Sequence, residues 1–274
     1  MEAALAQLKE RVGEIHDLGR ASSLLGWDQQ VKMPPGGGAV RAEQLATLGR
    51  LAHEALTSDE MGGLLEELAG VEPELDADSD EACLIRLMRR EWEKARRVPA
   101  DLQAEMSRAA SLAMPVWVKA RQDSDFSQFL PALRENFELR RQYVACFDDY
   151  EEPYDVLLDD FEPGMKTSEV RAVFDRLKEE QVPFVADVRR GDDRPLRGLT
   201  FPIEAQKQFE LTVIERFGYD AAEWRLDTAV HPFAASIATT DIRLTTRYFD
   251  HNLDGLFGTM HETASSAAIT PSRR

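Results

Sequence analysis

Apolar residues recur every three or four positions along much of the first 190 residues, the spacing that gives a helix one apolar face. The spacing is clearest in two stretches, whose apolar residues are Leu5, Leu8, Val12 and Ile15 in the first and Val170, Val173, Phe174 and Leu177 in the second. We predict a helix over each stretch, with Thr167 as the N-cap of the second. The pattern predicts a mainly helical fold.

Proline and glycine residues interrupt this helical pattern at two places. The segment from Trp27 to Gly38 contains Pro-Pro and three consecutive glycines, so we predict a loop there and a helix from about Ala39 to Leu56. Pro115 lies inside an otherwise helical stretch. Because proline removes a backbone donor and clashes with the preceding turn, we predict a kink or a break at Pro115.

Pairs of residues three positions apart predict where two further helices begin. Thr57 stands three residues before Glu60, and Asp78 stands three residues before Glu81. In a capping box, the first residue of such a pair accepts a hydrogen bond from the backbone of the second. We therefore predict a helix start at each pair, with the second helix reaching about Arg97.

The pattern changes in the last third of the chain. We predict a short strand over Leu196–Phe201 and a helix from Pro202 to Gly218, since proline suits a first turn and glycine suits a helix end. Alternating apolar residues predict strands within Arg225–Tyr248, and a last helix should start near Leu253 to Leu256. One mostly helical domain over residues 1–274, with a small sheet near its C-terminal end, accounts for these elements.

Charge and cysteine content narrow the class of protein. The chain has 33 Lys and Arg residues against 50 Asp and Glu residues, a net charge of −17, which argues against nucleic acid and anionic membranes as partners. No stretch approaches the roughly 18 apolar residues of a membrane span, and residues 1–5 show no secretory signal pattern. Cys83 and Cys146 lack CxxC spacing, so we expect buried free thiols in a reducing cytoplasm.

The main candidate for chemistry is the sequence Met260-His261-Glu262-Thr263. In the HExxH motif, two histidines at i and i+4 share a helix face and bind one Zn²⁺, while the glutamate polarises the attacking water. His261 and Glu262 fit the start of this motif, but the second histidine position is occupied by Ser265. A His-Glu pair by itself is a weak signal, because such pairs arise often by chance.

The four other histidines differ in their surroundings. His16 and His53 fall on ordinary helix surfaces, and His251 falls in a predicted turn that should face solvent. His231 precedes Pro232, which biases its backbone toward an extended conformation and suits a rigid site loop. By composition alone, a single histidine before proline is more often structural.

Several further segments occur in a fixed order along the chain. They are Leu25-Gly26-Trp27-Asp28-Gln29 with Met33-Pro34-Pro35-Gly36, Tyr154 to Asp159 with Phe161 to Gly164, Arg225-Leu226-Asp227, His231-Pro232-Phe233, Asp241 to Tyr248, and Met260 to Thr263. Together they resemble the carboxypeptidase Taq family of zinc carboxypeptidases. The likeness runs from about residue 5 to residue 263 and leaves 264–274 as a divergent tail. The His-Pro-Phe and Asp-x-Arg-x-Thr motifs are its most specific parts.

The resemblance implies the N-terminal half of a nearly all-helical metallopeptidase fold, with a long groove and a short sheet beside the metal helix. Family members release amino acids one at a time from peptide C-termini, use zinc or cobalt, and are usually cytoplasmic homodimers. On this resemblance His261 is the first zinc ligand and Glu262 is the general base. The groove wall is implied to include His231, Phe233, Asp241, Arg243 and Thr245.

The chain departs from the family pattern at two positions and in its tail. Ser265 replaces the second histidine, Trp224 replaces the family's glycine before Arg-Leu-Asp, and residues 264–274 do not resemble the family's long helical second half. Zinc catalysis needs three protein ligands and an open water position. We therefore expect a family member that is truncated within the motif and catalytically incomplete as this chain.

Three alternatives stay open on the sequence. Asp250, His251 and Asp254 lie near His261 and supply an improvised metal site if the chain is active. The chain is otherwise a non-catalytic helical module for interaction or dimerisation, since the surface that a missing half leaves exposed favours association. The third alternative is one half of a split carboxypeptidase, with the other half supplied by a second polypeptide.

Overall fold

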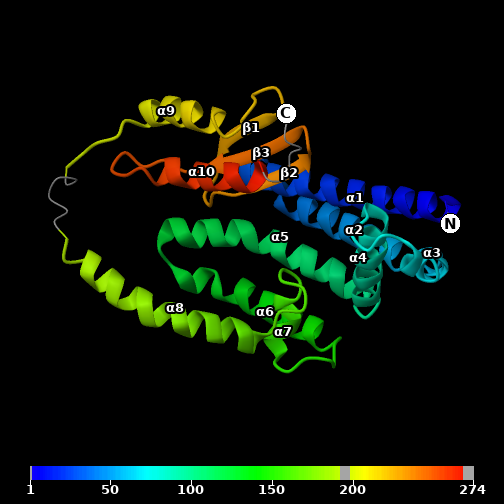
Figure 1. Ribbon diagram of the computed structural model, residues 1–274. Helices are drawn as coiled ribbons and strands as arrows, with labels where there is room; N and C mark the ends of the chain where they lie inside the picture. Colours follow the sequence, from blue (N-terminus) through cyan, green and yellow to red (C-terminus); the bar gives the residue numbers. More distant parts are fainter. Residues whose placement is uncertain (1, 192–197, 268–274) are drawn as a thin grey trace. The chain divides into compact units, whose positions relative to one another are not determined.

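The structure is a computed structural model that describes residues 2–191 and 198–267, and it is mainly helical with a small sheet near the C-terminal end (Figure 1). The helices are α1 (Glu2–Val31), α2 (Gly38–Leu56), α3 (Asp59–Ala69), α4 (Asp80–Ala95), α5 (Ala100–Asp123), α6 (Leu130–Val144), α7 (Pro153–Leu158), α8 (Thr167–Val188), α9 (Ile203–Glu215) and α10 (Asp254–Ala267). The strands are β1 (Trp224–Thr228), β2 (Ala234–Ala238) and β3 (Asp241–Thr246). The predicted fold class is confirmed.

The chain divides into two compact units, Met1–Leu139 with Phe201–Arg274 and Arg140–Thr200. The first unit contains α1 to α5, the sheet, α9 and α10, and the second contains α7 and α8. The prediction of a single domain over residues 1–274 stays a prediction. Along the described ranges, no helix combines the length and the apolar character that crossing a membrane requires.

The N-caps of two helices lie one residue after the N-caps that we predicted. Ser58 and Ser79 are the N-caps of α3 and α4, each with an extended backbone and a hydroxyl that accepts a backbone N–H at 3.3 Å. Thr57 ends α2 instead, because its hydroxyl donates to the carbonyl oxygen of His53 at 2.8 Å. The prediction of Thr57 and Asp78 as caps was wrong, although both helices form.

The predicted loop from Trp27 to Gly38 was wrong over its first half. Helix α1 continues to Val31, and a short 3₁₀ turn follows at Pro35–Gly37. The two prolines disfavour helix only at and just before their own positions, so they do not affect the turn that contains Trp27. Trp27 is therefore a buried helical residue, 5% exposed.

Helix α5 passes through Pro115 without the predicted break. Proline has no N–H for the carbonyl oxygen four residues earlier, which belongs to Ser111. The amide Nε2 of Gln29, on α1, donates to that oxygen at 3.0 Å, and the Ser111 hydroxyl donates back to Gln29 Oε1 at 3.0 Å. A side chain from a neighbouring helix thus replaces the missing backbone donor, so the helix continues.

The two cysteines are free but are not buried. Cys83 is exposed and Cys146 is half-buried, so the prediction of buried thiols was wrong. The buried face of α4 carries Ala82, Ile85 and Met88, and Cys83 lies off that face.

In the second unit, the carboxylate of Asp155 joins α7 to the start of α8. It accepts hydrogen bonds from the backbone N–H and the hydroxyl of Thr167 at 2.8 and 2.5 Å, and from two backbone N–H groups before α7. The Thr167 hydroxyl is the main cause that holds the pKa of Asp155 below its ordinary value. Lys166 is the N-cap residue of α8 and Thr167 is its first helical residue, so the predicted cap was wrong by one position.

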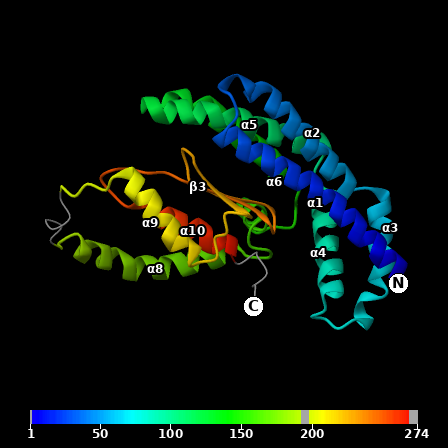
Figure 2. The same ribbon diagram turned by 90° about the horizontal axis from the view of Figure 1, so that it is seen from above.

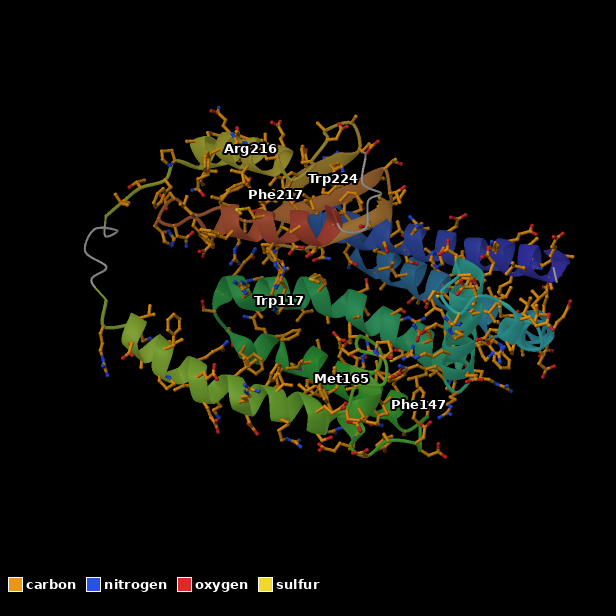
Figure 3. The ribbon with its side chains drawn as sticks, viewed as in Figure 1. Trp117, Phe147, Met165, Arg216, Phe217 and Trp224 are labelled. Carbon is orange, nitrogen blue, oxygen red and sulfur yellow. The ribbon has the colours of Figure 1, made fainter. Side chains whose placement is uncertain are left out.

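The sheet has the order β1-β3-β2, with β1 parallel and β2 antiparallel to β3. Trp224, labelled in Figure 3, packs with Ile242 and Leu244 in a small core on one side of the sheet. Strands within Arg225–Tyr248 are therefore confirmed. Residues 198–201 form no strand, and the rest of the strand predicted over Leu196–Phe201 lies outside the described residues.

Helices α9 and α10 agree with their predicted starts. Pro202 is the N-cap of α9, and Gly218 has φ +103° just after its end, a conformation that glycine adopts without strain. Helix α10 lies along the sheet in both views and contacts β2, β3 and α9 (Figures 1 and 2). This packing fixes the surroundings of His261 and Glu262.

Candidate functional site

Helix α10 presents one face of small residues to the sheet and one exposed face that carries His261. The buried residues are Gly255, Thr259, Thr263 and Ser266, which recur at helical spacing. His261 and Ser265 are both exposed, one turn apart, and Glu262 between these two faces is half-buried. Position 265 is therefore where a second histidine would share a helix face with His261.

The described residues of this chain do not by themselves group into a metal site. Within the described ranges, no three His, Cys, Asp or Glu residues are grouped closely enough to hold a metal ion. At the place of the second histidine, the Ser265 hydroxyl donates to the carbonyl oxygen of His261 at 3.1 Å. A helical back-bond of this kind engages the backbone of His261 and adds no second imidazole to its helix face.

The improvised metal site is not assembled either. His251 is exposed, with its Nδ1 3.4 Å from Oδ1 of Asp250. Asp254 accepts a hydrogen bond from the amide of Asn252 at 2.9 Å as part of the start of α10. These side chains bond to their sequence neighbours, and the described residues bring none of them into a ligand group with His261.

The His231-Pro232-Phe233 segment is held against β3 by Thr245. The Thr245 hydroxyl accepts the backbone N–H of Phe233 at 2.7 Å and lies 2.8 Å from the carbonyl oxygen of Phe233, to which it donates. The backbone N–H of Thr245 donates to the same carbonyl at 2.9 Å. Thr245 is fully buried, so it acts through Phe233 and presents no surface of its own.

The same segment lies beside α10. A Cβ placed on Gly258 would be 4.0 Å from Cγ of Pro232, an ordinary contact distance. His231 is exposed, and its Nδ1 is 2.6 Å from the carbonyl oxygen of Pro232. The structure thus brings the His231-Pro232-Phe233 segment next to the helix of His261, with the contact made by Pro232.

Asp241 and Arg243 form a second group on β3. Nε and one terminal nitrogen of Arg243 donate to the two carboxylate oxygens of Asp241, both at 2.9 Å. The guanidinium carbon of Arg243 lies 4.4 Å from the ring centre of Trp27, and that of Arg225 lies 5.4 Å from the same ring. Such cation–π contacts stabilise the packing of α1 on the sheet.

Two acidic residues near the sheet, Asp227 and Glu210, were not among the site residues predicted from the sequence. Asp227 on β1 pairs with Arg225 and with Lys32, the latter at 2.8 Å, and so completes the link between α1 and the sheet. Its position in the Arg-Leu-Asp motif was the signal that could have identified it. Glu210 on α9 is fully buried beside α10, and no local pattern marks it.

Three comparisons with known proteins agree with this architecture. A family model described as carboxypeptidase Taq (M32) metallopeptidase matches residues 7–266. Thermostable carboxypeptidase 1 of Thermus thermophilus is 35% identical over 95% of this chain and 54% of its own length. Carboxypeptidase 1 of Bacillus subtilis is 34% identical over 88% of this chain and 49% of its own length.

Solved structures show the same fold over the same share of their length. The crystal structure of BsuCP has a TM-score of 0.89 and 31% identity, covering 95% of this chain and 53% of that one. The M32 carboxypeptidase of Deinococcus radiodurans R1 has a TM-score of 0.78 and 30% identity, covering 96% and 53%. The chain belongs to the carboxypeptidase Taq (M32) metallopeptidase family, and it spans about half the length of these relatives.

Proposed function

We propose that this chain forms the part of a metallocarboxypeptidase that carries the first metal ligand, His261, and the general base, Glu262. The observation that supports this most directly is the exposed His261 on α10, in a chain that the family model matches from residue 7 to residue 266. Zinc, or cobalt in its place, is the proposed metal, and peptide C-termini are the proposed substrates. A homodimer in the cytoplasm is the proposed setting.

We further propose that this chain is catalytically incomplete without the remaining half of the family fold. A zinc site needs three protein ligands, while Ser265 offers only a hydroxyl, which donates to the backbone carbonyl oxygen of His261. Relatives of about twice the length have room for the missing ligands in the part that this chain does not cover. A truncated chain or one polypeptide of a split enzyme fits this arrangement.

The five groove residues take two different roles in this proposal. His231 and Phe233 flank Pro232, which lies beside α10, the helix that carries His261. Thr245 holds Phe233, and the Asp241–Arg243 pair holds α1 through Trp27. We propose that the first two contact substrate and that the other three shape the groove.

The purified chain should hold less than one zinc per molecule and should release no amino acids from peptide C-termini. The reason is the missing second histidine, which leaves a single imidazole for the metal. Zinc content and peptide hydrolysis measure this directly, with the Thermus thermophilus relative as the positive control. Stoichiometric zinc together with trimming that Glu262→Gln abolishes would contradict incompleteness and favour an improvised site.

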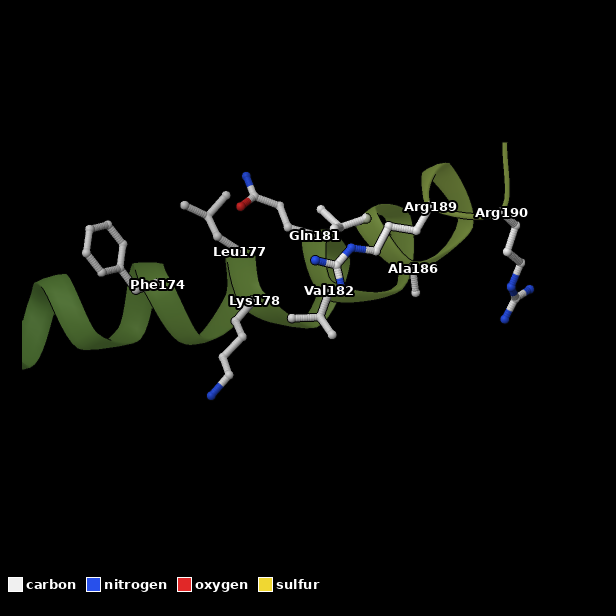
Figure 4. A pocket seen from close by; sticks show the side chains of 9 residues that line it. Phe174, Leu177, Lys178, Gln181, Val182, Ala186, Arg189 and Arg190 are labelled. Carbon is white, nitrogen blue, oxygen red and sulfur yellow. The ribbon is translucent and has the colours of Figure 1, made fainter. Parts of the chain in front are cut away.

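A second candidate function, self-association, is favoured by the apolar face of α8. Val170, Phe174, Leu177, Gln181, Phe184 and Val188 alternate by four and three residues, the spacing of a coiled-coil seam. Phe174 and Phe184 are 62% and 67% exposed, and α8 buries none of its residues. Figure 4 shows Phe174, Leu177 and Gln181 projecting from the same side of the helix, along a pocket lined by residues of α8 and by Arg189 and Arg190 just after it.

Light scattering should show a dimer that Phe174→Ser with Phe184→Ser converts to a monomer. We propose that the apolar face of α8 packs against the same face of a second copy of the chain. Identical helix faces pair in this way when their apolar positions repeat every seven residues. Phe209→Ser is the matched control, because Phe209 is similarly exposed, at 57%, on a different helix. A wild-type chain that stays monomeric at the highest concentration would rule out this use of α8.

A further inference from the structure

Helix α9 buries two polar side chains, although some of its large apolar residues are exposed. Its fully or nearly fully buried residues are Gln206, Glu210 and Ile214, one turn apart, whereas Phe209 and Leu211 are exposed. Gln206 has an evident structural role, because its amide Nε2 donates to the carbonyl oxygens of Phe201 and Phe249, both at 2.7 Å. Glu210 has no such backbone partner and needs a separate explanation.

The carboxyl group of Glu210 is surrounded by hydroxyls. The Tyr248 hydroxyl bonds to Oε2, and Thr246 and Thr259 stand close to the same carboxyl. Burial raises the pKa of Glu210 above its ordinary value, and the hydrogen bond from the Tyr248 hydroxyl opposes that shift. In the described part of the chain, Glu210 has no ion-pair partner.

One oxygen on each side of the α9–α10 contact lacks a well-aligned hydrogen-bond partner. Oε1 of Glu210 and Oγ1 of Thr259 are both buried, and neither forms a hydrogen bond of good geometry with any described residue. Buried polar atoms are costly unless they bond to something. A neutral Glu210 can donate its proton across this contact to Thr259, which would satisfy both atoms at once.

The packed face of α10 carries only small side chains, so van der Waals packing alone does little to fix the rotation of the helix about its axis. This face consists of Gly255, Thr259, Thr263 and Ser266, so the helix approaches its neighbours closely but offers no large side chain to interlock. The approach is close at Gly255, where an added Cβ would lie 2.9 Å from Cδ1 of Tyr248. The Thr246 hydroxyl donates to the carbonyl oxygen of Gly255 at 3.1 Å and holds the first turn.

We propose that Glu210 is a positioning residue that sets the rotation and register of α10 through Thr259 and Tyr248. A slip of one residue would turn the helix by about 100° and move His261 off the exposed face. Contacts between small side chains allow several rotations of a helix against its neighbours. A buried polar contact favours the one rotation in which its hydrogen bonds form. The consequence of this positioning for catalysis rests on the proposed function of His261 and Glu262. The role of Glu210 in the packing of α10 does not depend on that function.

Hydrogen exchange of backbone amides tests this role in the intact chain. Glu210→Ala should lower the protection of α10 amides at least about tenfold relative to amides of α2 and α5. Glu210→Gln should restore most of that protection, because the amide keeps an acceptor for Tyr248 and gains a donor for Thr259. If Glu210→Ala does not fold, Thr259→Val offers the same comparison from the other side of the contact.

Gln206→Ala is the matched control. It removes a buried polar side chain one turn earlier on the same face, and its partners are carbonyl oxygens outside α10. Equal loss of α10 protection in Gln206→Ala, or equal loss in Glu210→Gln and Glu210→Ala, would overturn the positioning role. Exchange is measured without substrate or metal, so a failure here differs from a failure of the proposed peptidase function.

Discussion

Replacing Glu210 with glutamine will make the chain more stable than the wild type at pH 8 and will reduce the dependence of its stability on pH. Burial raises the pKa of Glu210 in the folded state above its ordinary value of 4.5. The folded state therefore keeps a proton that the unfolded chain releases at lower pH. The carboxyl group costs the folded state progressively more as the pH rises, and glutamine has no such cost.

The sign and the pH window follow from this raised pKa. The favourable contribution of the protonated carboxyl is fully present below pH 4.5 and is lost as the pH rises through the folded-state pKa. Between these two values the folding equilibrium constant of the wild type should fall by up to about tenfold per pH unit, relative to Glu210→Gln. Urea unfolding followed by circular dichroism from pH 4 to pH 8 measures this difference.

Other titrating groups contribute to both curves and cancel in the difference between the two proteins. Glu204→Gln is the matched control, because it removes a glutamate charge from an exposed position on α9, where Glu204 pairs with Lys207. A stability difference between wild type and Glu210→Gln that is the same at every pH would contradict the prediction. So would a pH-dependent difference of equal size in Glu204→Gln.

Replacing Ser265 with histidine will create zinc binding at α10, at least about tenfold tighter than that of the wild-type chain. Positions 261 and 265 are exposed one turn apart, so two imidazoles there can bind one ion from the same helix face. The substitution costs the fold little, because the serine hydroxyl bonds only to its own helix, at the carbonyl oxygen of His261. Competition with a coloured zinc chelator measures the affinity.

The double variant His261→Gln with Ser265→His is the control for this measurement. It keeps one exposed imidazole on α10 and removes the pair, so its affinity should return to that of the wild type. Equal zinc affinity in the single and double variants would show that the added histidine binds metal with other groups. Two histidines still fall short of three ligands, so we expect no peptide hydrolysis from Ser265→His alone.

The class of fold and the family were accessible from the sequence, because both are recorded in local patterns. Apolar spacing identified the helices, alternation identified the strands within Arg225–Tyr248, and the His-Pro-Phe and Asp-x-Arg-x-Thr motifs identified the family. The helix of His261 and Glu262 was also predicted in its correct place. These features depend on residues that are close together in the chain.

The errors arose where a side-chain hydrogen bond changed the outcome. Pro115 was predicted to kink or break α5, but the helix continues there and the side chain of Gln29 supplies the missing donor. Thr57 looked like the start of a helix, but its hydroxyl closes the preceding one. The rules that proline breaks a helix and that threonine begins one are physically sound. In each case a side-chain hydrogen bond that the rule does not include changed the outcome.

The sequence by itself determined that this is a helical member of the M32 metallopeptidase family with Ser265 at the place of a second metal histidine. Only the tertiary structure decided which groups act together: Thr245 with Phe233, Arg243 with Trp27, and Glu210 with Tyr248 and Thr259. The physical reason is that burial and hydrogen bonding depend on neighbours in space. A glutamate on α9 looks like any solvated helix residue until α10 packs over it and removes it from water.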